Sequence, residues 1–214
     1  MKITTDNLIR WSGIAAMIGG ICYVLVGVFH PLNIPASVTT TTWLVVHLLA
    51  MAMSFFGLLG LAGIYARQAE NAGWLGLAGY VLLSLWLALI LGFTFVEVFI
   101  LPVLATAAPV FVAGWLGMFT GNASAIALGA LPTVWTITGP LYIVGGVLFG
   151  IATFRARILP RWAGLLLAVG TAIGPLAALV SLEYQPKVAV PVGLALVWLG
   201  YALWAERREQ GSQR

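Results

Sequence analysis

The chain has 214 residues, of which 62% are hydrophobic and 7% are charged, and its formal net charge is +4. Its mean hydropathy is +1.06. A water-soluble domain usually has about a quarter of its residues charged, so this composition excludes a soluble domain and predicts a polytopic membrane protein. The basic residues gather at the ends of apolar runs. That distribution sets membrane orientation and argues against nucleic acid as a partner.

The first apolar run, residues 11–29, follows a short segment that contains Lys2 and Arg10. This arrangement resembles a signal peptide, but the run is longer than the usual hydrophobic region and no A-x-A cleavage site follows it closely. We therefore expect it to be a retained first span. It contains the only cysteine, Cys22, so an intrachain disulfide and a redox site built on a thiol pair are excluded.

Six apolar runs are long enough to cross a bilayer, which takes about 20 residues in a helix. They predict an all-α fold: a polytopic transmembrane helical bundle in which residues 1–214 form a single transmembrane domain. The predicted spans are roughly 11–30, 43–66, 74–103, 132–154, 162–182 and 188–205.

The basic residues predict the orientation of these spans, because positive charge is retained on the cytoplasmic side. With a cytoplasmic N-terminus, only Lys187 falls on the outer side. We therefore expect six spans with both termini cytoplasmic. The basic residues on the predicted inner side are Lys2, Arg10, Arg67, Arg155, Arg157, Arg161, Arg207, Arg208 and Arg214.

Within residues 105–131, the stretch 109–131 is apolar enough to suggest a seventh span, but the polar residues 120–124 interrupt it. Counting it as a span would also place the arginines of residues 155–161 outside. We expect this segment on the outer surface, with residues 109–119 in the interface or folded back over the bundle and Trp115 at an interfacial depth. Two interpretations stay open: a lid, or a lipid-facing interfacial helix.

A weak internal repeat marks the three outward-going spans, which begin with W-x-G at Trp11, Trp74 and Trp162. Three helical hairpins of similar sequence would produce this pattern, and so would a general requirement for tryptophan at the interface. Close helix approach is expected where small residues recur, as at Gly146 and Gly150 in the fourth span.

The turn between the fourth and fifth spans, residues 154–164, reads F-R-A-R-I-L-P-R-W-A-G. It resembles the inner loop of uncharacterised bacterial six-span membrane proteins, which commonly reads R-x-x-x-L-P-R-W-x-G. The resemblance implies a prokaryotic cytoplasmic (inner) membrane protein. It carries over no activity and no functional residue.

Ionisable residues inside a membrane are costly, so they are the first candidates for function. Four fall in the predicted outer half: His30, His47, Glu97 and Glu183. Two imidazoles and one or two carboxylates are a donor set for zinc or non-haem iron, and two histidines can ligate a haem. The alternative is that the histidines bond helix ends or Glu97. Similar depth alone does not predict that the four side chains meet.

Glu97 is the most informative of these residues, because the sequence around it is apolar and Thr94 lies one turn earlier on the same face. A carboxyl group there is protonated, paired with His47 or Lys187, or in contact with water. We expect either a proton-handling or ligand-binding group, or a structural carboxylate at the interface.

A second candidate site comes from a doubled T-x-x-G-P-L motif. It places Thr136 and Pro140 in the fourth span and Thr171 and Pro175 in the fifth, at similar depth. Paired helix breaks are typical of transporter binding sites, although ordinary proline kinks give the same pattern. The hydroxyl of each threonine is expected to help satisfy the backbone that its proline opens. Trp135 and Trp86 are candidate walls of a pocket.

Nucleotide-binding loops, nucleophile elbows and metalloprotease motifs are missing from the sequence. We therefore expect a non-enzymatic protein that binds a hydrophobic small molecule in an outward-facing polar cleft, or an accessory subunit of a larger membrane complex. A small proton-coupled transporter that uses Glu97 and His47 is the second hypothesis. A metal- or haem-dependent enzyme is the third; otherwise no cofactor is predicted.

Overall fold

The computed structural model describes residues 3–212, with the side chains of all except Asp6 and residues 206–212. Lys2 and Arg214 lie outside the described residues, as do the side chains of Arg207 and Arg208. Within this part the chain is helical and contains no strand, which confirms the predicted all-α class.

Four helices of the described part are long and apolar enough to cross a membrane, as expected for a membrane protein. One of the four, α2 (Thr41–Phe95), continues through a π-helical turn, η2 (Val96–Ile100), into the short helix α3 (Leu101–Ala107). The four are α1 (Thr5–Phe29), α2 (Thr41–Phe95) with this continuation, α5 (Leu131–Ala156) and α7 (Val190–Ser212), which follows the 3-10 turn η4 (Gln185–Ala189).

The helix α2 is a hairpin rather than a single rod, because its backbone reverses at Gly73, where φ is 56° and ψ is −155°. The two arms, residues 41–72 and 74–95, run back along one another. Tyr65 stacks on Tyr80 with ring centroids 4.9 Å apart, and Gly57 packs against Leu87. The second and third predicted spans therefore correspond to the two arms, and one glycine makes the turn between them.

The fifth predicted span, residues 162–182, differs from the structure. The helix α6 (Arg161–Ala172) ends after 12 residues, and a 3-10 segment, η3 (Gly174–Leu179), comes next. Pro175 explains this ending, because proline lacks an N–H and its ring clashes with the carbonyl four residues back, that of Thr171. Pro140 remains inside α5. Of the two interpretations of the doubled motif, a matched pair of helix breaks is therefore not what the structure has.

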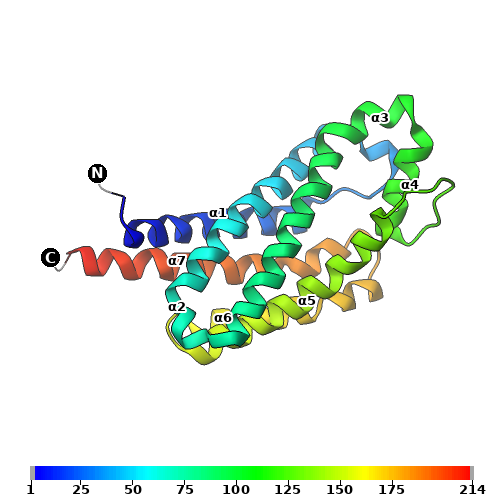
Figure 1. Cartoon of the computed structure of the whole chain (residues 1–214). Coiled ribbons are helices and arrows are strands. Elements are labelled where there is room, and N and C mark those ends of the chain that lie inside the picture. Colours follow the sequence, from blue (N-terminus) through cyan, green and yellow to red (C-terminus); the bar gives the residue numbers. More distant parts are fainter. Residues whose placement is uncertain (1–2, 213–214) are drawn as a thin grey trace.

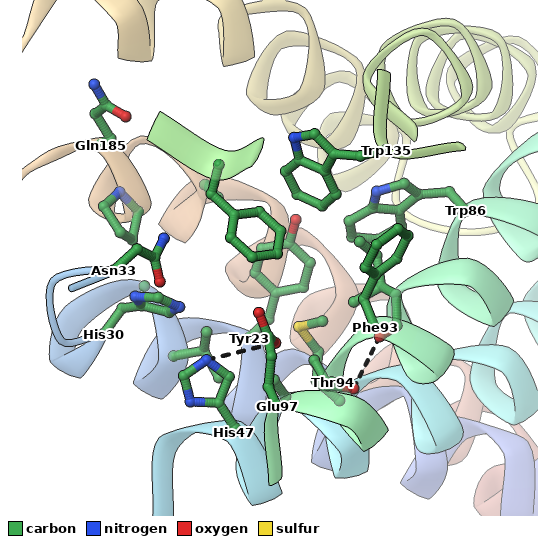
Figure 2. A pocket seen from close by; sticks show the side chains of 18 residues that line it. Tyr23, His30, Asn33, His47, Trp86, Phe93, Thr94, Glu97, Trp135 and Gln185 are labelled. Atoms are coloured by element: carbon green, nitrogen blue, oxygen red, sulfur yellow. Dashed lines mark hydrogen bonds and ion pairs between the residues drawn. The ribbon is translucent and has the colours of Figure 1, made fainter. Parts of the chain in front are cut away.

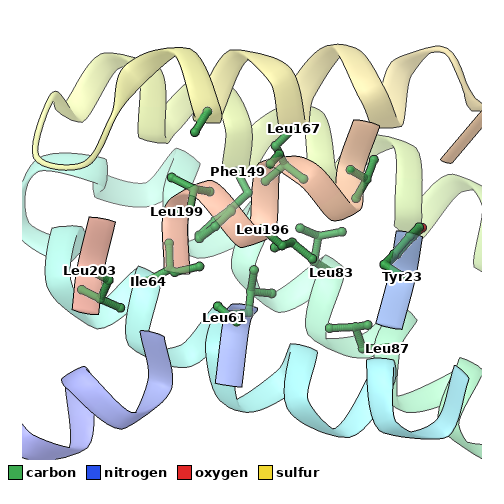
Figure 3. Close-up of a cluster of buried hydrophobic side chains, with 14 of the residues drawn as sticks. Tyr23, Leu61, Ile64, Leu83, Leu87, Phe149, Leu167, Leu196, Leu199 and Leu203 are labelled. Carbon is green, nitrogen blue, oxygen red and sulfur yellow. The ribbon is translucent and has the colours of Figure 1, made fainter. Parts of the chain in front are cut away.

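The helices form a closed circuit of neighbours: α1 packs on α2 and α7, α2 on α5, α5 on α6, and α6 on α7. Figure 3 shows the core between them, with buried leucines from both arms of α2 and from α6 and α7 around Phe149. Small residues let the backbones approach, and Gly150 lies against Gly164 and Ala168. The predicted close approach at Gly146 and Gly150 is confirmed.

A second buried cluster lies at one end of the bundle, beneath α4 (Pro109–Thr120) and the short η1 (Pro35–Ser37). Trp115 is 2% exposed, so its side chain packs within this cluster. Residues 109–119 thus fold back onto the bundle, which is one of the two arrangements expected for this segment. The members of this cluster are Val38, Trp43, Phe93, Leu101, Val112, Trp115 and Leu116.

The segments that connect the long helices lie at the two ends of the bundle (Figure 1). The ends of the chain, the Gly73 turn and the basic turn between α5 and α6 lie at one end, and α3 and α4 lie at the other. In the basic turn, Arg157 adopts a left-handed conformation with φ of 56°, and the Arg161 guanidinium stacks over Phe154, 4.0 Å from the ring centroid.

Candidate functional site

A cavity of about 390 Å³ lies at the α4 end of the bundle. Its lining comes from α1, both arms of α2, η2, α4, α5 and η4. Figure 2 shows Trp86, Phe93 and Trp135 on one side of the lining, with Thr94 next to Phe93. His30, His47, Asn33 and Gln185 lie on the other side, and Glu97 lies between the two. The polar side chains are Asn33, His30, His47, Glu97, Thr94 and Gln185.

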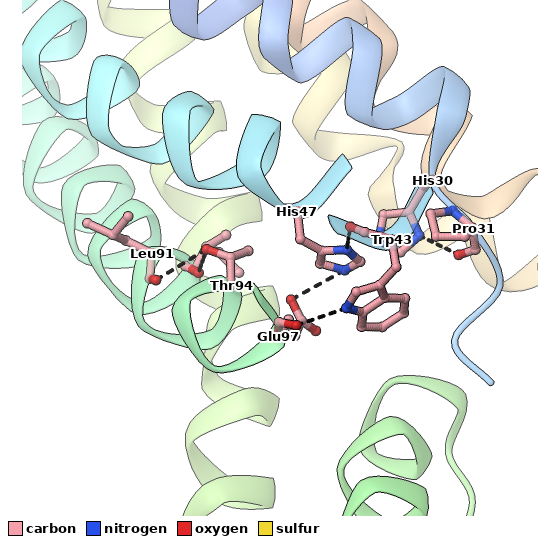
Figure 4. Close-up of polar contacts among 8 residues, drawn as sticks. His30, Pro31, Trp43, His47, Leu91, Thr94 and Glu97 are labelled. Atoms are coloured by element: carbon pink, nitrogen blue, oxygen red, sulfur yellow. Dashed lines mark hydrogen bonds and ion pairs between the residues drawn. The ribbon is translucent and has the colours of Figure 1, made fainter. Parts of the chain in front are cut away.

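His47 and Glu97 face each other across the α2 hairpin, with 3.5 Å between His47 Nε2 and Glu97 Oε2 (Figure 4). Both residues are buried, at 1% and 6% exposed. The other ring nitrogen of His47, Nδ1, is 2.8 Å from the Trp43 carbonyl. A carbonyl only accepts, so Nδ1 carries a hydrogen and donates it. His47 Nε2 has no hydrogen-bond partner of its own.

Glu97 sits in the π-helical turn η2, whose geometry leaves its backbone carbonyl without a helical donor. The N–H of Leu101 bonds Val96 instead, five residues back. The next residue, Pro102, has no N–H to give. Trp43 supplies the missing donor, because its indole Nε1 donates to the Glu97 carbonyl at 2.9 Å. Single π-helical turns inside α-helices are frequent at functional sites.

His30 caps the C-terminus of α1 and lies beside His47, with ring centroids 5.1 Å apart in an edge-to-face arrangement. Its Nδ1 donates to the carbonyl of Pro31 at 2.7 Å. Burial lowers the pKa of His30 below its usual value, and this hydrogen bond opposes the shift more weakly.

Thr94 lines the cavity, but its hydroxyl donates to backbone carbonyls of its own helix, those of Ile90 at 2.8 Å and Leu91 at 3.2 Å. The Thr94 hydroxyl can therefore only accept a hydrogen bond from a ligand.

Aromatic rings form the opposite wall and hold one another in place. Trp135 meets Phe93 at 5.5 Å and Phe119 at 4.5 Å between ring centroids, both edge to face. Trp86 packs on Tyr23 at 6.1 Å. Edge-to-face contacts of this kind favour particular ring orientations, so the rings of this apolar wall support one another.

The residues of the doubled T-x-x-G-P-L motif do not come together at this cavity. Thr136 and Pro140 are exposed on α5, and Thr171 is buried between helices, where it contacts Gly146. Pro175 lines an adjoining cavity of about 360 Å³ together with Trp135. The threonine hydroxyls bond the preceding turn of their own helices, Thr136 to Pro132 and Thr171 to Leu167, rather than the backbone opened by the prolines.

The four residues of the metal hypothesis are not brought together. His30, His47 and Glu97 line the cavity, whereas Glu183 is exposed and does not line it. Among the described residues, no group of three or more His, Cys, Asp or Glu side chains is arranged to hold a metal ion. The ring centroids of His30 and His47 lie 5.1 Å apart, which leaves no room for a haem between the two rings.

Sequence reasoning missed the contribution of Trp43, Asn33, Tyr23 and Gln185. No sequence signal pointed to the Trp43 bond: in an α-helix Pro102 leaves the Val98 carbonyl without a donor, and the free carbonyl moves to Glu97 only because of the π-helical turn. Neither Asn33 nor Tyr23 stands out in the sequence.

Comparisons of the chain with protein-family models, with curated proteins and with solved structures gave no match.

Proposed function

We propose that this chain is an integral membrane protein that binds a hydrophobic small molecule in the cavity between α1, the α2 hairpin, α4 and α5. The observation that carries the proposal is one cavity with an aromatic wall and, opposite it, the buried His47–Glu97 pair. Ligand sites are typically concave, largely apolar and furnished with a few convergent polar groups.

The membrane arrangement is part of this proposal: six spans, with both termini in the cytoplasm of a prokaryotic cell and the cavity toward the outer face of the cytoplasmic membrane. Arg67, Arg155, Arg157 and Arg161 support it, because they precede or form the turns at the end of the bundle opposite the cavity.

Labelling of single cysteines in whole cells tests the arrangement. In a Cys22→Ala background, Ser181→Cys should react with a membrane-impermeant maleimide from outside, and Trp74→Cys should react only after the membrane is opened. Both parent side chains are exposed, so accessibility is decided by the membrane. The reverse pattern would overturn the orientation.

Binding is tested with N-phenyl-1-naphthylamine, an uncharged apolar fluorophore that accepts energy from tryptophan. The protein in lipid nanodiscs should show a saturable transfer signal above the lipid background, because Trp86 and Trp135 line the cavity. Ala50→Phe fills the cavity and should remove the saturable part. Ala88→Phe, an exposed alanine on the same hairpin, is the matched control and should keep it.

A small proton-coupled carrier is the second candidate, favoured by the 3.5 Å approach of His47 and Glu97. Liposomes that contain the protein and trapped pyranine should then show proton movement that depends on added ligand, and Glu97→Gln should abolish it. An accessory subunit would instead remain bound to a larger complex when the membrane is dissolved in mild detergent.

A further inference from the structure

The His47–Glu97 pair needs one proton between its facing atoms. His47 Nδ1 already donates to the Trp43 carbonyl, so in the neutral ring Nε2 presents a lone pair toward Glu97. An ionised carboxylate is also only an acceptor. Two acceptors 3.5 Å apart and away from water repel, and a single proton on either atom removes the conflict. With that proton the pair has no net charge; without it the net charge is −1.

The rest of the cavity lining is suited to a positively charged ligand. Among the described residues around the cavity, none is lysine or arginine, and the titratable side chains are Tyr23 and His30 from α1 and its cap, and His47 and Glu97 from the α2 hairpin and η2. The walls from α4, α5 and η4 contribute no titratable group. The faces of tryptophan, tyrosine and phenylalanine rings attract cations. Asn33 Oδ1 adds a buried acceptor with no partner.

We propose that the cavity takes a lipophilic organic cation of the quaternary ammonium or phosphonium type, and that its binding releases the proton shared by His47 and Glu97 to bulk water. The exchange balances in charge: the protonated pair is neutral and the ligand brings +1, so the occupied site holds the cation beside a pair of charge −1 and frees one H⁺. This inference rests on the proposed function, since it names the ligand class of the same cavity.

Three ligands that share phenyl rings but differ in charge test the inference: tetraphenylphosphonium, tetraphenylborate and uncharged triphenylphosphine oxide. Calorimetry of the full chain in detergent should show tighter binding of the phosphonium than of the other two. In buffers of different ionisation enthalpy, the phosphonium should release about one proton per site. Its Kd should fall by about tenfold for each unit of rising pH in the range where the pair holds its proton.

Glu97→Gln removes the charge but keeps the shape of the side chain. We expect phosphonium binding to weaken by at least about tenfold, with no proton release and a flat pH dependence. Glu183→Gln neutralises an exposed carboxyl group outside the cavity and is the matched control, with binding and proton release unchanged. The proton count on the unmodified protein needs no variant, so a failure of Glu97→Gln to fold leaves the test intact.

The outcomes separate this inference from the function on which it rests. Phosphonium binding without proton release overturns the exchange. Equal binding of the borate or the phosphine oxide overturns the cation class but leaves a hydrophobic site in place. Saturable transfer to N-phenyl-1-naphthylamine without phosphonium binding likewise overturns the cation class and leaves a hydrophobic site in place. Absence of every one of these signals overturns both proposals.

Discussion

The indole N–H of Trp43 donates to the backbone carbonyl of Glu97 at 2.9 Å, across two arms of one helical hairpin. The same indole stacks on the His47 ring with centroids 3.9 Å apart. Trp43 therefore positions both members of the buried pair, one through its backbone and the other through its ring.

Replacing Trp43 with phenylalanine should leave the Glu97 carbonyl without a donor in a buried position. The expected loss is roughly 1–3 kcal/mol in the free energy of unfolding, the usual cost of an unsatisfied buried acceptor. The measurement is the change in apparent Tm of the purified variant in detergent. Trp74→Phe is the matched control, because Trp74 is 85% exposed, and its Tm should stay at the parental value. Equal shifts in the two variants would contradict the role of the indole donor.

Pro102→Ala should partly rescue the Trp43→Phe variant. The alanine restores an N–H five residues after Glu97, which a continued π-helical turn can direct to the Glu97 carbonyl. A double-mutant cycle of the four proteins should give a coupling of about 0.5–3 kcal/mol, since the two donors serve one acceptor. Additive Tm shifts would show that Pro102 and Trp43 act independently.

Gly73→Ala should destabilise the hairpin for a purely conformational reason. A Cβ at this position would meet no atom within 4 Å, so no clash is involved. The backbone at φ 56° and ψ −155° is, however, nearly restricted to glycine, and we expect a cost of about 1–3 kcal/mol. Gly92→Ala is the control, because it also meets no atom within 4 Å but lies within the helix and should leave Tm unchanged or raise it. Stability is read from thermal unfolding followed by circular dichroism.

His30 should make stability depend on pH. Because burial lowers its pKa in the folded protein, folding favours the neutral ring. That stabilisation is fully present above the pKa of the unfolded state, about 6.5, and is lost as the pH falls toward the lower folded pKa. His30→Gln, which cannot titrate, should lose less Tm than the parent between neutral and mildly acidic pH. Identical pH profiles for the two proteins would contradict this assignment.

Most of the helices were predictable from the sequence, with the fifth predicted span the exception, but the rotation of each helix about its axis was not. Apolar length located both arms of the α2 hairpin, and the depth of His47 and Glu97 placed both in one half of the bundle. Their meeting depends on how each arm turns about its axis, and this is decided by packing at many small residues, such as Gly57 against Leu87. Glu183 illustrates the limit, since it shares the predicted depth yet lies exposed outside the cavity.

Proline was the feature for which pattern reasoning failed most clearly. Two identical T-x-x-G-P-L motifs predict the same distortion, but Pro140 stays in a helix that continues for sixteen residues to Ala156, whereas Pro175 ends α6. The difference lies in the chain beyond each proline. Pro175 itself lies in the 3-10 segment η3, and the polar stretch around Glu183 follows, so no α-helix continues beyond this proline.

The side chains of the site come from two parts of the structure: the hairpin that turns at Gly73, with its continuation η2, and the helices packed around it. Trp43, His47, Trp86, Phe93 and Glu97 all belong to one hairpin and its direct continuation, whereas His30, Phe119 and Trp135 arrive on α1, α4 and α5. The separation of His47 and Glu97 is therefore set within the hairpin and its continuation, whereas the width of the cavity depends also on the helices packed around it. The His47–Glu97 pair is thus formed within one continuous segment of the chain, and the other helices complete the cavity around it.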